Sequence, residues 1–176
     1  MNKTELAKKI YEKSYITGKF RLRSGKMSNE YFDKYRFESD PEMIQAIALH
    51  MKQMLPDDFD LIGGLEMGGI PLATTLALEI GKPMIFIRKE AKQYGTAKFA
   101  EGPEIKGKKI LLIEDVVTSG GQIILSTNDL RKHGATVENA LCVIDREAGG
   151  PEKLAANNIK LQPILTMSQI KEAAQK

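Results

Sequence analysis

Along most of the chain, apolar runs of strand length alternate with segments whose apolar residues recur at helical spacing. The expected strands are residues 60–65, 83–88, 109–115, 136–145 and 161–165. Amphipathic helices should follow them, ending near 81, 134 and 156, with a last helix from 168. This alternation predicts an α/β fold with a mostly parallel twisted sheet and helices on both faces. Ligands of such sheets bind beyond the carboxyl ends of the strands, so the loops there should hold the site.

The first 60 residues follow a different pattern. A helix is expected over about residues 4–16, with Thr4 as its cap and Gly18 at its end. Residues 19–37 alternate apolar and charged side chains, which predicts a short antiparallel hairpin outside the main sheet. Asp40, followed by proline and glutamate, marks the start of the next helix.

Composition narrows the class of protein. The 176 residues predict a single domain, 1–176, and 26 basic against 23 acidic residues leave a charge of only +3. So balanced a charge, with neither a DNA-binding module nor a basic stripe, predicts no nucleic-acid partner. Apolar runs fall short of the roughly 20 residues that span a bilayer, so no membrane association is expected. The single cysteine, Cys142, lies in an apolar run, which predicts a buried thiol in a reduced, cytoplasmic setting.

The stretch 110–122, ILLIEDVVTSGGQ, carries the strongest chemical signal. Its apolar run ends in two acids, Glu114 and Asp115, and two hydroxyls and two glycines follow before a helix begins. Free backbone N–H groups at a helix N-terminus predict a phosphate site, while the acids would suit the hydroxyls of a diol. The pattern therefore favours a binding site for ribose 5-phosphate over an ordinary strand–helix turn without a ligand. It matches neither a Walker A loop nor the dinucleotide GxGxxG motif.

Three other strand ends face the same expected crevice. The loop 88–102 is rich in cations, which either close over a polyanion or form a solvated connection. Residues 66–69, EMGG, form either a tight turn or a second phosphate contact, and spacing alone does not decide between them. Arg146 is either a surface residue or a bidentate partner for a ligand carboxylate.

These stretches together resemble the orotate phosphoribosyltransferases, a branch of the type I phosphoribosyltransferases. IEDVVTSGGQ resembles the family's signature for 5-phospho-α-D-ribose 1-diphosphate (PRPP), and FIRKEAKQYG resembles its mobile catalytic loop. FRLRSGKMSNEYFD is similar to the family's hood hairpin, GGLEMGGIPLATTLA to its pyrophosphate-side loop and helix, and IDREAGG to the end of its next strand. The hood would comprise about residues 18–38 together with C-terminal elements.

The resemblance implies transfer of ribose 5-phosphate from PRPP to orotate, giving orotidine 5′-monophosphate and pyrophosphate in de novo pyrimidine (UMP) synthesis. It implies Lys92, Arg88 and Asp115 as catalytic residues, and Thr118 and Arg146 as orotate contacts. The implied PRPP contacts are Arg23, Arg88, Lys89, Lys92, Tyr94, Glu114, Asp115, Val116, Val117, Thr118, Ser119, Gly120, Gly121 and Gln122.

The resemblance also implies a cofactor and an assembly. Mg²⁺ would be held mainly by the substrate rather than by protein ligands. A homodimer would share the mobile loop between subunits. At Tyr94 the family commonly has histidine, and tyrosine can donate a hydrogen bond there but carries no positive charge at neutral pH. Two alternatives stay open at this point, a transferase for a purine or another base and a PRPP-sensing regulator without turnover.

Overall fold

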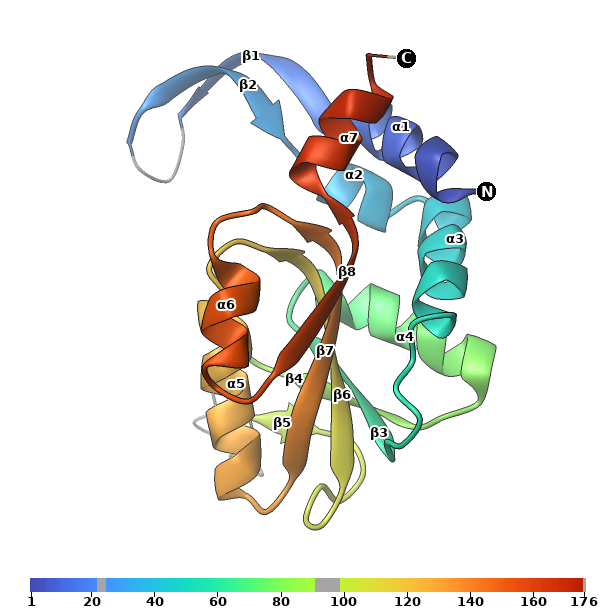
Figure 1. The fold of residues 1–176 in the computed structure, drawn as a ribbon, viewed down its shortest axis with the longest axis vertical. Coiled ribbons are helices and arrows are strands. Elements are labelled where there is room, and N and C mark those ends of the chain that lie inside the picture. Colours follow the sequence, from blue (N-terminus) through green and yellow to red (C-terminus); the bar gives the residue numbers. More distant parts are fainter. Residues whose placement is uncertain (22–24, 91–98, 176) are drawn as a thin grey trace.

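The computed structural model describes residues 1–21, 25–90 and 99–175, and its described strands form one large sheet and one hairpin (Figure 1). The large sheet has the strand order β5-β4-β3-β6-β7-β8. Its strands are β3 (Leu61–Leu65), β4 (Met84–Ile87), β5 (Ala100–Glu101), β6 (Lys109–Val117), β7 (Thr136–Asp145) and β8 (Lys160–Thr166). Neighbouring strands are parallel except at the β4–β5 edge. The mostly parallel sheet predicted from the apolar runs is confirmed.

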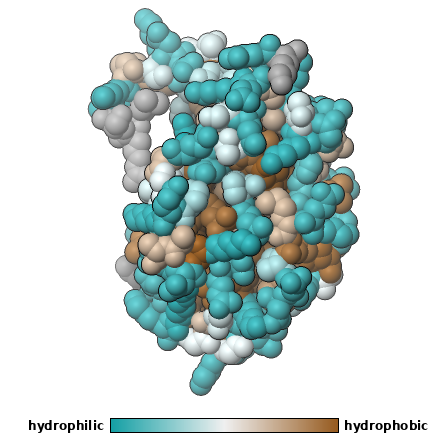
Figure 2. All heavy atoms as spheres, in the orientation of Figure 1, coloured by the Kyte–Doolittle hydropathy of each residue, from teal (hydrophilic) through white to brown (hydrophobic). Residues whose placement is uncertain are grey.

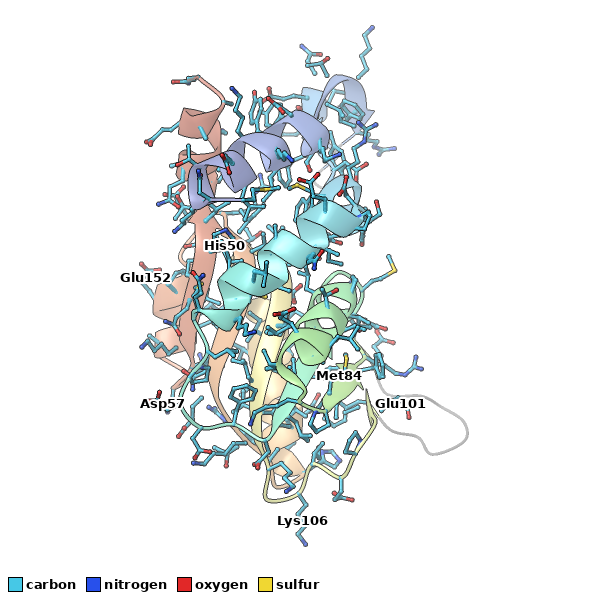
Figure 3. The ribbon with its side chains drawn as sticks, turned by 90° about the vertical axis from the view of Figure 1, so that its right-hand side faces the viewer. His50, Asp57, Met84, Glu101, Lys106 and Glu152 are labelled. Atoms are coloured by element: carbon cyan, nitrogen blue, oxygen red, sulfur yellow. The ribbon has the colours of Figure 1, made fainter. Side chains whose placement is uncertain are left out.

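Helices cover both faces of this sheet, as the alternating pattern predicted. One face carries α3 (Pro41–Lys52) and α4 (Gly69–Ile80), and the other carries α5 (Gly121–Lys132) and α6 (Gly150–Ala155), as Figures 1 and 3 show. Two buried apolar clusters fill the space on the two sides. All five residues of β3 are buried, because a strand covered on both faces has no solvent-facing side.

The order of the strands reverses between β3 and β6. From β3 the chain proceeds through α4 to β4 on one side, and from β6 it proceeds through α5 to β7 on the other. The loops after β3 and β6 therefore leave the sheet side by side and lead to helices on opposite faces (Figure 1). This reversal is the place where open α/β sheets form a ligand crevice.

A second layer lies beyond the carboxyl ends of the strands (Figure 1). It contains the antiparallel pair β1 (Tyr15–Arg21) and β2 (Met27–Phe32), with α1 (Lys3–Ser14), the short α2 (Tyr35–Glu38) and α7 (Met167–Ala173). The hairpin outside the main sheet is thus confirmed. Its position puts the N-terminal and C-terminal elements above the strand ends where a ligand is expected.

The boundaries of the first helix differ from the prediction. Asn2, not Thr4, is the N-cap, and its side chain accepts from the Glu5 N–H at 2.9 Å while Glu5 bonds back to the Asn2 N–H. This reciprocal capping box stabilises a start two residues earlier than the hydroxyl of Thr4 suggested. The helix ends at Ser14, and Gly18 lies within β1 rather than at the helix end.

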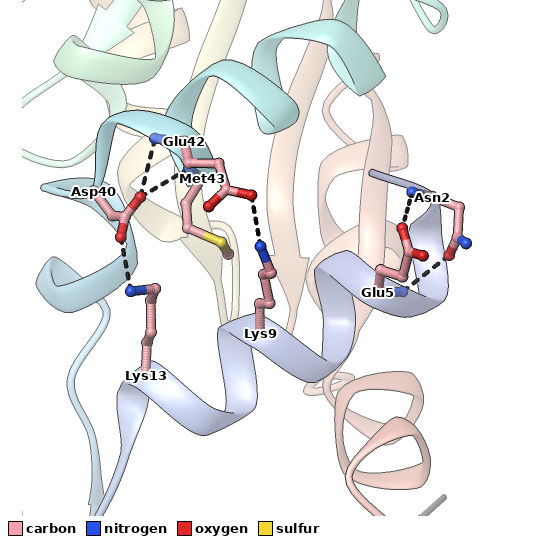
Figure 4. A network of polar contacts seen from close by, with 7 residues as sticks. All are labelled: Asn2, Glu5, Lys9, Lys13, Asp40, Glu42 and Met43. Carbon is pink, nitrogen blue, oxygen red and sulfur yellow. Dashed lines mark hydrogen bonds and ion pairs between the residues drawn. The ribbon is translucent and has the colours of Figure 1, made fainter.

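Ion pairs connect α1 to the start of α3 (Figure 4). Lys9 Nζ lies 2.5 Å from Glu42 Oε1, and Lys13 Nζ lies 2.7 Å from Asp40 Oδ2. Asp40 also caps α3 as predicted, since its Oδ1 accepts from the Glu42 and Met43 N–H groups. Because Asp40 follows α2 closely, this network also fixes the end of the short helix that borders the site.

The edge strand β5 was not predicted. It has only two residues, and Glu101 pairs with Phe86 of β4 at the edge where Figure 3 labels Met84 and Glu101. The face in Figure 2 is mostly hydrophilic, with apolar side chains gathered across the middle of the molecule. Among the described residues, no helix combines the length and the apolar character needed to cross a bilayer.

Candidate active site

A polar pocket of about 280 Å³ lies where the strand order reverses. The end of β6, the loop after it and the start of α5 form most of its wall, and the loops after β3 and β4 and the start of α2 complete it. Its lining residues are Lys34, Tyr35, Glu66, Met67, Lys89, Glu114, Asp115, Val116, Val117, Thr118, Ser119, Gly120, Gly121, Gln122 and Ile123. The whole predicted stretch from Glu114 to Gln122 is therefore in one cavity.

The loop after β6 leads directly onto the N-terminus of α5. Gly120 is the N-cap with φ +71°, a left-handed conformation that glycine adopts without steric cost. A glycine cap has no side chain to accept from the first N–H groups of the helix, so these donors can serve a ligand. Together with the helix dipole and the hydroxyls of Thr118 and Ser119, they form a site suited to a phosphate group.

The loop after β3 approaches β6 so closely that only glycine fits. A Cβ at Gly68 would lie 1.6 Å from Asp115 Oδ2, and a Cβ at Gly69 would lie 2.3 Å from the Ile113 carbonyl oxygen. The peptide between Glu66 and Met67 is cis. The EMGG turn is therefore part of the pocket, and its glycines are required for close packing, which spacing alone left undecided.

Asp115 is fixed at the pocket wall although it is almost fully buried, at 1% exposure. One carboxylate oxygen accepts from the Val116 N–H, and the other forms an ion pair with Lys34 Nζ. Burial alone would lower the pKa of Lys34, but the hydrogen bond and charge of Asp115 outweigh it and raise that pKa. Lys34 therefore stays an ammonium ion beside the buried acid.

Two more carboxyl groups surround Asp115. Glu38, 5% exposed, has its pKa raised to about 8 by burial first and then by the charge and hydrogen bonding of Asp115. Glu114 is partly open to solvent, yet protein surrounds its carboxyl group. That burial, ahead of the Asp115 charge, raises its pKa well above the ordinary value. One lysine thus faces three acids, and at neutral pH they do not all carry a full charge.

The cationic loop after β4 begins in the pocket. Lys89 lines it, and its backbone N–H donates to Glu66 Oε1 at 2.6 Å, which connects the loops after β3 and β4. The side chain of Arg88 instead lies 3.6 Å from Glu101 Oε1 on β5. Of the other predicted contacts, Arg23, Lys92 and Tyr94 lie outside the described residues.

Arg146 follows β7 on the side of the hairpin layer. Its N–H donates to the Val117 carbonyl oxygen at 2.8 Å, so its backbone is held against the end of β6. A hydrogen bond with Glu30, followed by burial, raises the pKa of Tyr15 on β1 to about 12, and the nearby positive charge of Arg146 opposes this shift. Arg146 therefore lies between the pocket strand and the hairpin.

Five lining residues were not among the predicted contacts for PRPP or orotate: Lys34, Tyr35, Glu66, Met67 and Ile123. Lys34 is the most informative of them, because its ion pair with Asp115 joins positions 81 residues apart in the sequence. The alternating pattern of residues 19–37 gave no reason to distinguish Lys34 from the other charged residues expected to face solvent. Within the described part of the chain, no group of three or more His, Cys, Asp or Glu residues is arranged to hold a metal ion.

Comparison with known proteins agrees with this geometry. The family model of the phosphoribosyl transferase domain matches residues 36–165. An orotate phosphoribosyltransferase of Nocardioides sp. is 46% identical over 90% of this chain and 88% of its own. One of Pyrococcus abyssi is 40% identical over 98% and 97%. A crystal structure of Mycobacterium tuberculosis orotate phosphoribosyltransferase in complex with PRPP superposes with TM-score 0.81 and 25% identity, covering 96% and 98% of the two chains.

Proposed function

Because the chain belongs to the orotate phosphoribosyltransferase family, we propose that its pocket carries out the transfer of ribose 5-phosphate from PRPP to orotate. The products are orotidine 5′-monophosphate and pyrophosphate, a step of de novo pyrimidine (UMP) synthesis. One observation carries the proposal: the acids Glu114 and Asp115 share a single cavity with the open N-terminus of α5. This arrangement suits a molecule that has both a phosphate and a diol.

PRPP, the donor substrate, is assigned to the end of β6 and to the loop and helix start that follow it. The N–H groups and hydroxyls of residues 118–122 bind the 5-phosphate, and Glu114 and Asp115 accept from the ribose hydroxyls. The EMGG turn after β3 then faces the pyrophosphate end.

The reaction exchanges one bond at the anomeric carbon for another. The bond from this carbon to a pyrophosphate oxygen breaks, a bond to a ring nitrogen of orotate forms, and that nitrogen releases its proton to the departing pyrophosphate or to water. Positive charge develops on the ribose and negative charge on the leaving group, so no protein nucleophile is needed. Lys89 in the pocket, with Arg88 and Lys92 on the same loop, neutralises the departing pyrophosphate, while the fixed loops supply orientation.

Magnesium is proposed as the cofactor. The pocket offers carboxylates already engaged with a lysine and a backbone N–H, a donor set that does not complete an octahedral shell. The ion would therefore bind mainly through the pyrophosphate and hydroxyl oxygens of PRPP. When bound, it offsets charge on the pyrophosphate.

Further proposals concern the assembly and setting. A homodimer that shares the loop after β4 between its subunits is proposed from the family resemblance, as is a hood built from about residues 18–38 with C-terminal elements. A cytoplasmic setting fits the free, buried thiol of Cys142. Analytical ultracentrifugation and mixing of two inactive variants with lesions on different sides of the site would test the shared loop. Recovery of activity on mixing is expected.

Arg146→Ala is expected to raise KM for orotate by about 10- to 100-fold, the usual loss for a charge-assisted hydrogen bond. The KM for PRPP should change much less, because Arg146 is proposed to bind the carboxylate of the acceptor. Initial rates with each substrate varied in turn measure both constants. The reverse order of effects would contradict the carboxylate role.

The activity itself is tested by mixing the protein with PRPP, orotate and magnesium and following orotate consumption optically. Hypoxanthine, adenine and uracil serve as comparison bases. Turnover with orotate alone is expected, since a purine has no carboxylate for Arg146. Reaction with a purine but not with orotate would contradict the proposal. Binding of PRPP without turnover of any base would favour the alternative of a PRPP-sensing regulator.

A further inference from the structure

The neighbours of Asp115 define a role that the transfer reaction alone does not assign. Lys34 and Glu38 are four residues apart, so the helical turn through α2 brings both side chains to the same face. That face is turned to β6, where Lys34 pairs with Asp115. A Cβ added to Gly68 would lie 1.6 Å from Asp115 Oδ2 and 2.8 Å from Glu38 Oε2. The two carboxyl groups therefore lie next to each other against one glycine.

If both carboxyl groups were ionised, neither could donate a hydrogen bond to the other, because a carboxylate only accepts. Among the described residues, neither oxygen of Glu38 has a hydrogen-bond donor, although both are buried. A proton on Glu38 removes this conflict, because a carboxylic acid donates to the neighbouring carboxylate. The alternative, a buried unpaired charge beside a second one, costs several kcal/mol in general.

The position of Glu38 is fixed by its neighbours along the chain. Phe37 is fully buried in the core, and Asp40 caps α3 and pairs with Lys13 of α1. The backbone of Glu38 therefore cannot shift away from Asp115 without displacing a core side chain or breaking a helix cap. The charged groups that act on it are Asp115, Lys34 and Asp33, with Glu114 acting through Asp115.

We propose that Glu38 is a positioning residue for the transfer reaction: it retains its proton, donates a hydrogen bond through it to Asp115 and, together with Lys34, fixes that carboxylate toward the ribose hydroxyls of PRPP. This inference rests on the proposed function. Burial and the Asp115 charge raise the pKa of Glu38 to about 8, so the proton is present at neutral pH and is lost in mildly alkaline solution. Loss of the proton places the carboxylates of Glu38 and Asp115 side by side as two anions, which weakens the binding of PRPP.

The test compares Glu38→Gln with the wild type between pH 6 and pH 9.5. Glutamine donates an N–H to Asp115 but does not ionise. Above about pH 8 the wild type is expected to lose at least the roughly tenfold in kcat/KM for PRPP that removal of one hydrogen bond to a charged group costs. Glu38→Gln should stay within about threefold of the wild type at pH 7, the scale of a conserved hydrogen bond, and should exceed it at pH 9. Glu42→Gln, the same change at an exposed acid of α3, should follow the wild-type profile.

Glu38→Ala supplies the complementary result. It removes the donor at every pH, so KM for PRPP should rise about tenfold at pH 7, the effect of one lost hydrogen bond to a charged group, with little change for orotate. Should Glu38→Ala not fold, Glu38→Gln still decides the matter. Infrared difference spectra give a readout apart from activity, a protonated-carboxyl band at pH 7 that Glu38→Gln lacks.

The outcomes separate this inference from the proposed function. Failure of the wild type to convert orotate removes the function. Turnover by the wild type with the same alkaline decline in Glu38→Gln, or with no decline in either protein, overturns the role of Glu38 alone. Equal losses in the glutamine and alanine variants at pH 7 would also overturn it, because a purely structural defect does not distinguish a donor from its absence.

Discussion

Asp115→Asn is expected to lower kcat/KM for PRPP by about 100- to 1000-fold, the scale found when a preorganised charged group is removed from an active site. The amide keeps an oxygen for the Val116 N–H, but it turns its NH2 group toward Lys34. Two donors then face each other, and the half-buried ammonium of Lys34 loses its counter-charge. The ribose hydroxyls lose their acceptor at the same time.

The measurement is steady-state kinetics with PRPP varied, accompanied by a melting curve. Asp58→Asn is the matched control, because Asp58 also pairs with a lysine, Lys109, but its side chain is 71% exposed on the surface. An exposed pair contributes little, so the control should keep both its Tm and its activity. Near-normal kcat/KM in Asp115→Asn would contradict the assignment of this acid to the ribose.

Gly68→Ala is expected to remove most of the activity and to destabilise the protein. The added methyl group would lie 1.6 Å from Asp115 Oδ2, so either the Asp115 side chain or the turn after β3 must move. Such overpacking typically costs about 1–3 kcal/mol, or roughly 2–12 °C in Tm for a chain of this size. Both possible movements displace a wall of the pocket, so the loss of activity should exceed what the loss of folded protein explains.

Gly81→Ala separates crowding from backbone strain. Gly81 ends α4 with φ +68°, but no heavy atom lies within 4 Å of the position where its Cβ would be. The substitution should cost about 1 kcal/mol through the left-handed conformation and leave kcat/KM unchanged. Gly68→Ala with full activity would show that the close approach of the two loops is not needed for the reaction.

The repeating pattern of the sequence was sufficient for the sheet and its main helices. β7 runs from Thr136 to Asp145 as predicted, and Asp40 caps α3, because burial periodicity and capping are local properties of the chain. The phosphate loop was also predictable, since strand end, acids, hydroxyls and glycines are consecutive. The two-residue strand β5 had no periodic signal, because a two-residue strand is too short to repeat.

The parts of the site that depend on distant contacts were beyond the sequence pattern. Lys34 lies in the stretch of alternating charges and Glu38 directly follows it, and nothing there distinguishes a buried acid from a solvated one. Only the fold brings them to Asp115, 81 residues after Lys34. Similarly, the sequence left open whether the two glycines after β3 form a tight turn or a phosphate contact, because their close approach to β6 depends on the fold.

The adjacency of β3 and β6 has a consequence for how the family tolerates change. Their register, from Leu61 opposite Ile110 to Gly64 opposite Ile113, is held by backbone hydrogen bonds at the usual strand spacing of about 4.8 Å. The distance between the two loops proposed to hold the ends of PRPP is therefore set by main-chain atoms. Side chains of the helical layers can be replaced during evolution without altering that distance, in line with a TM-score of 0.81 at 25% identity.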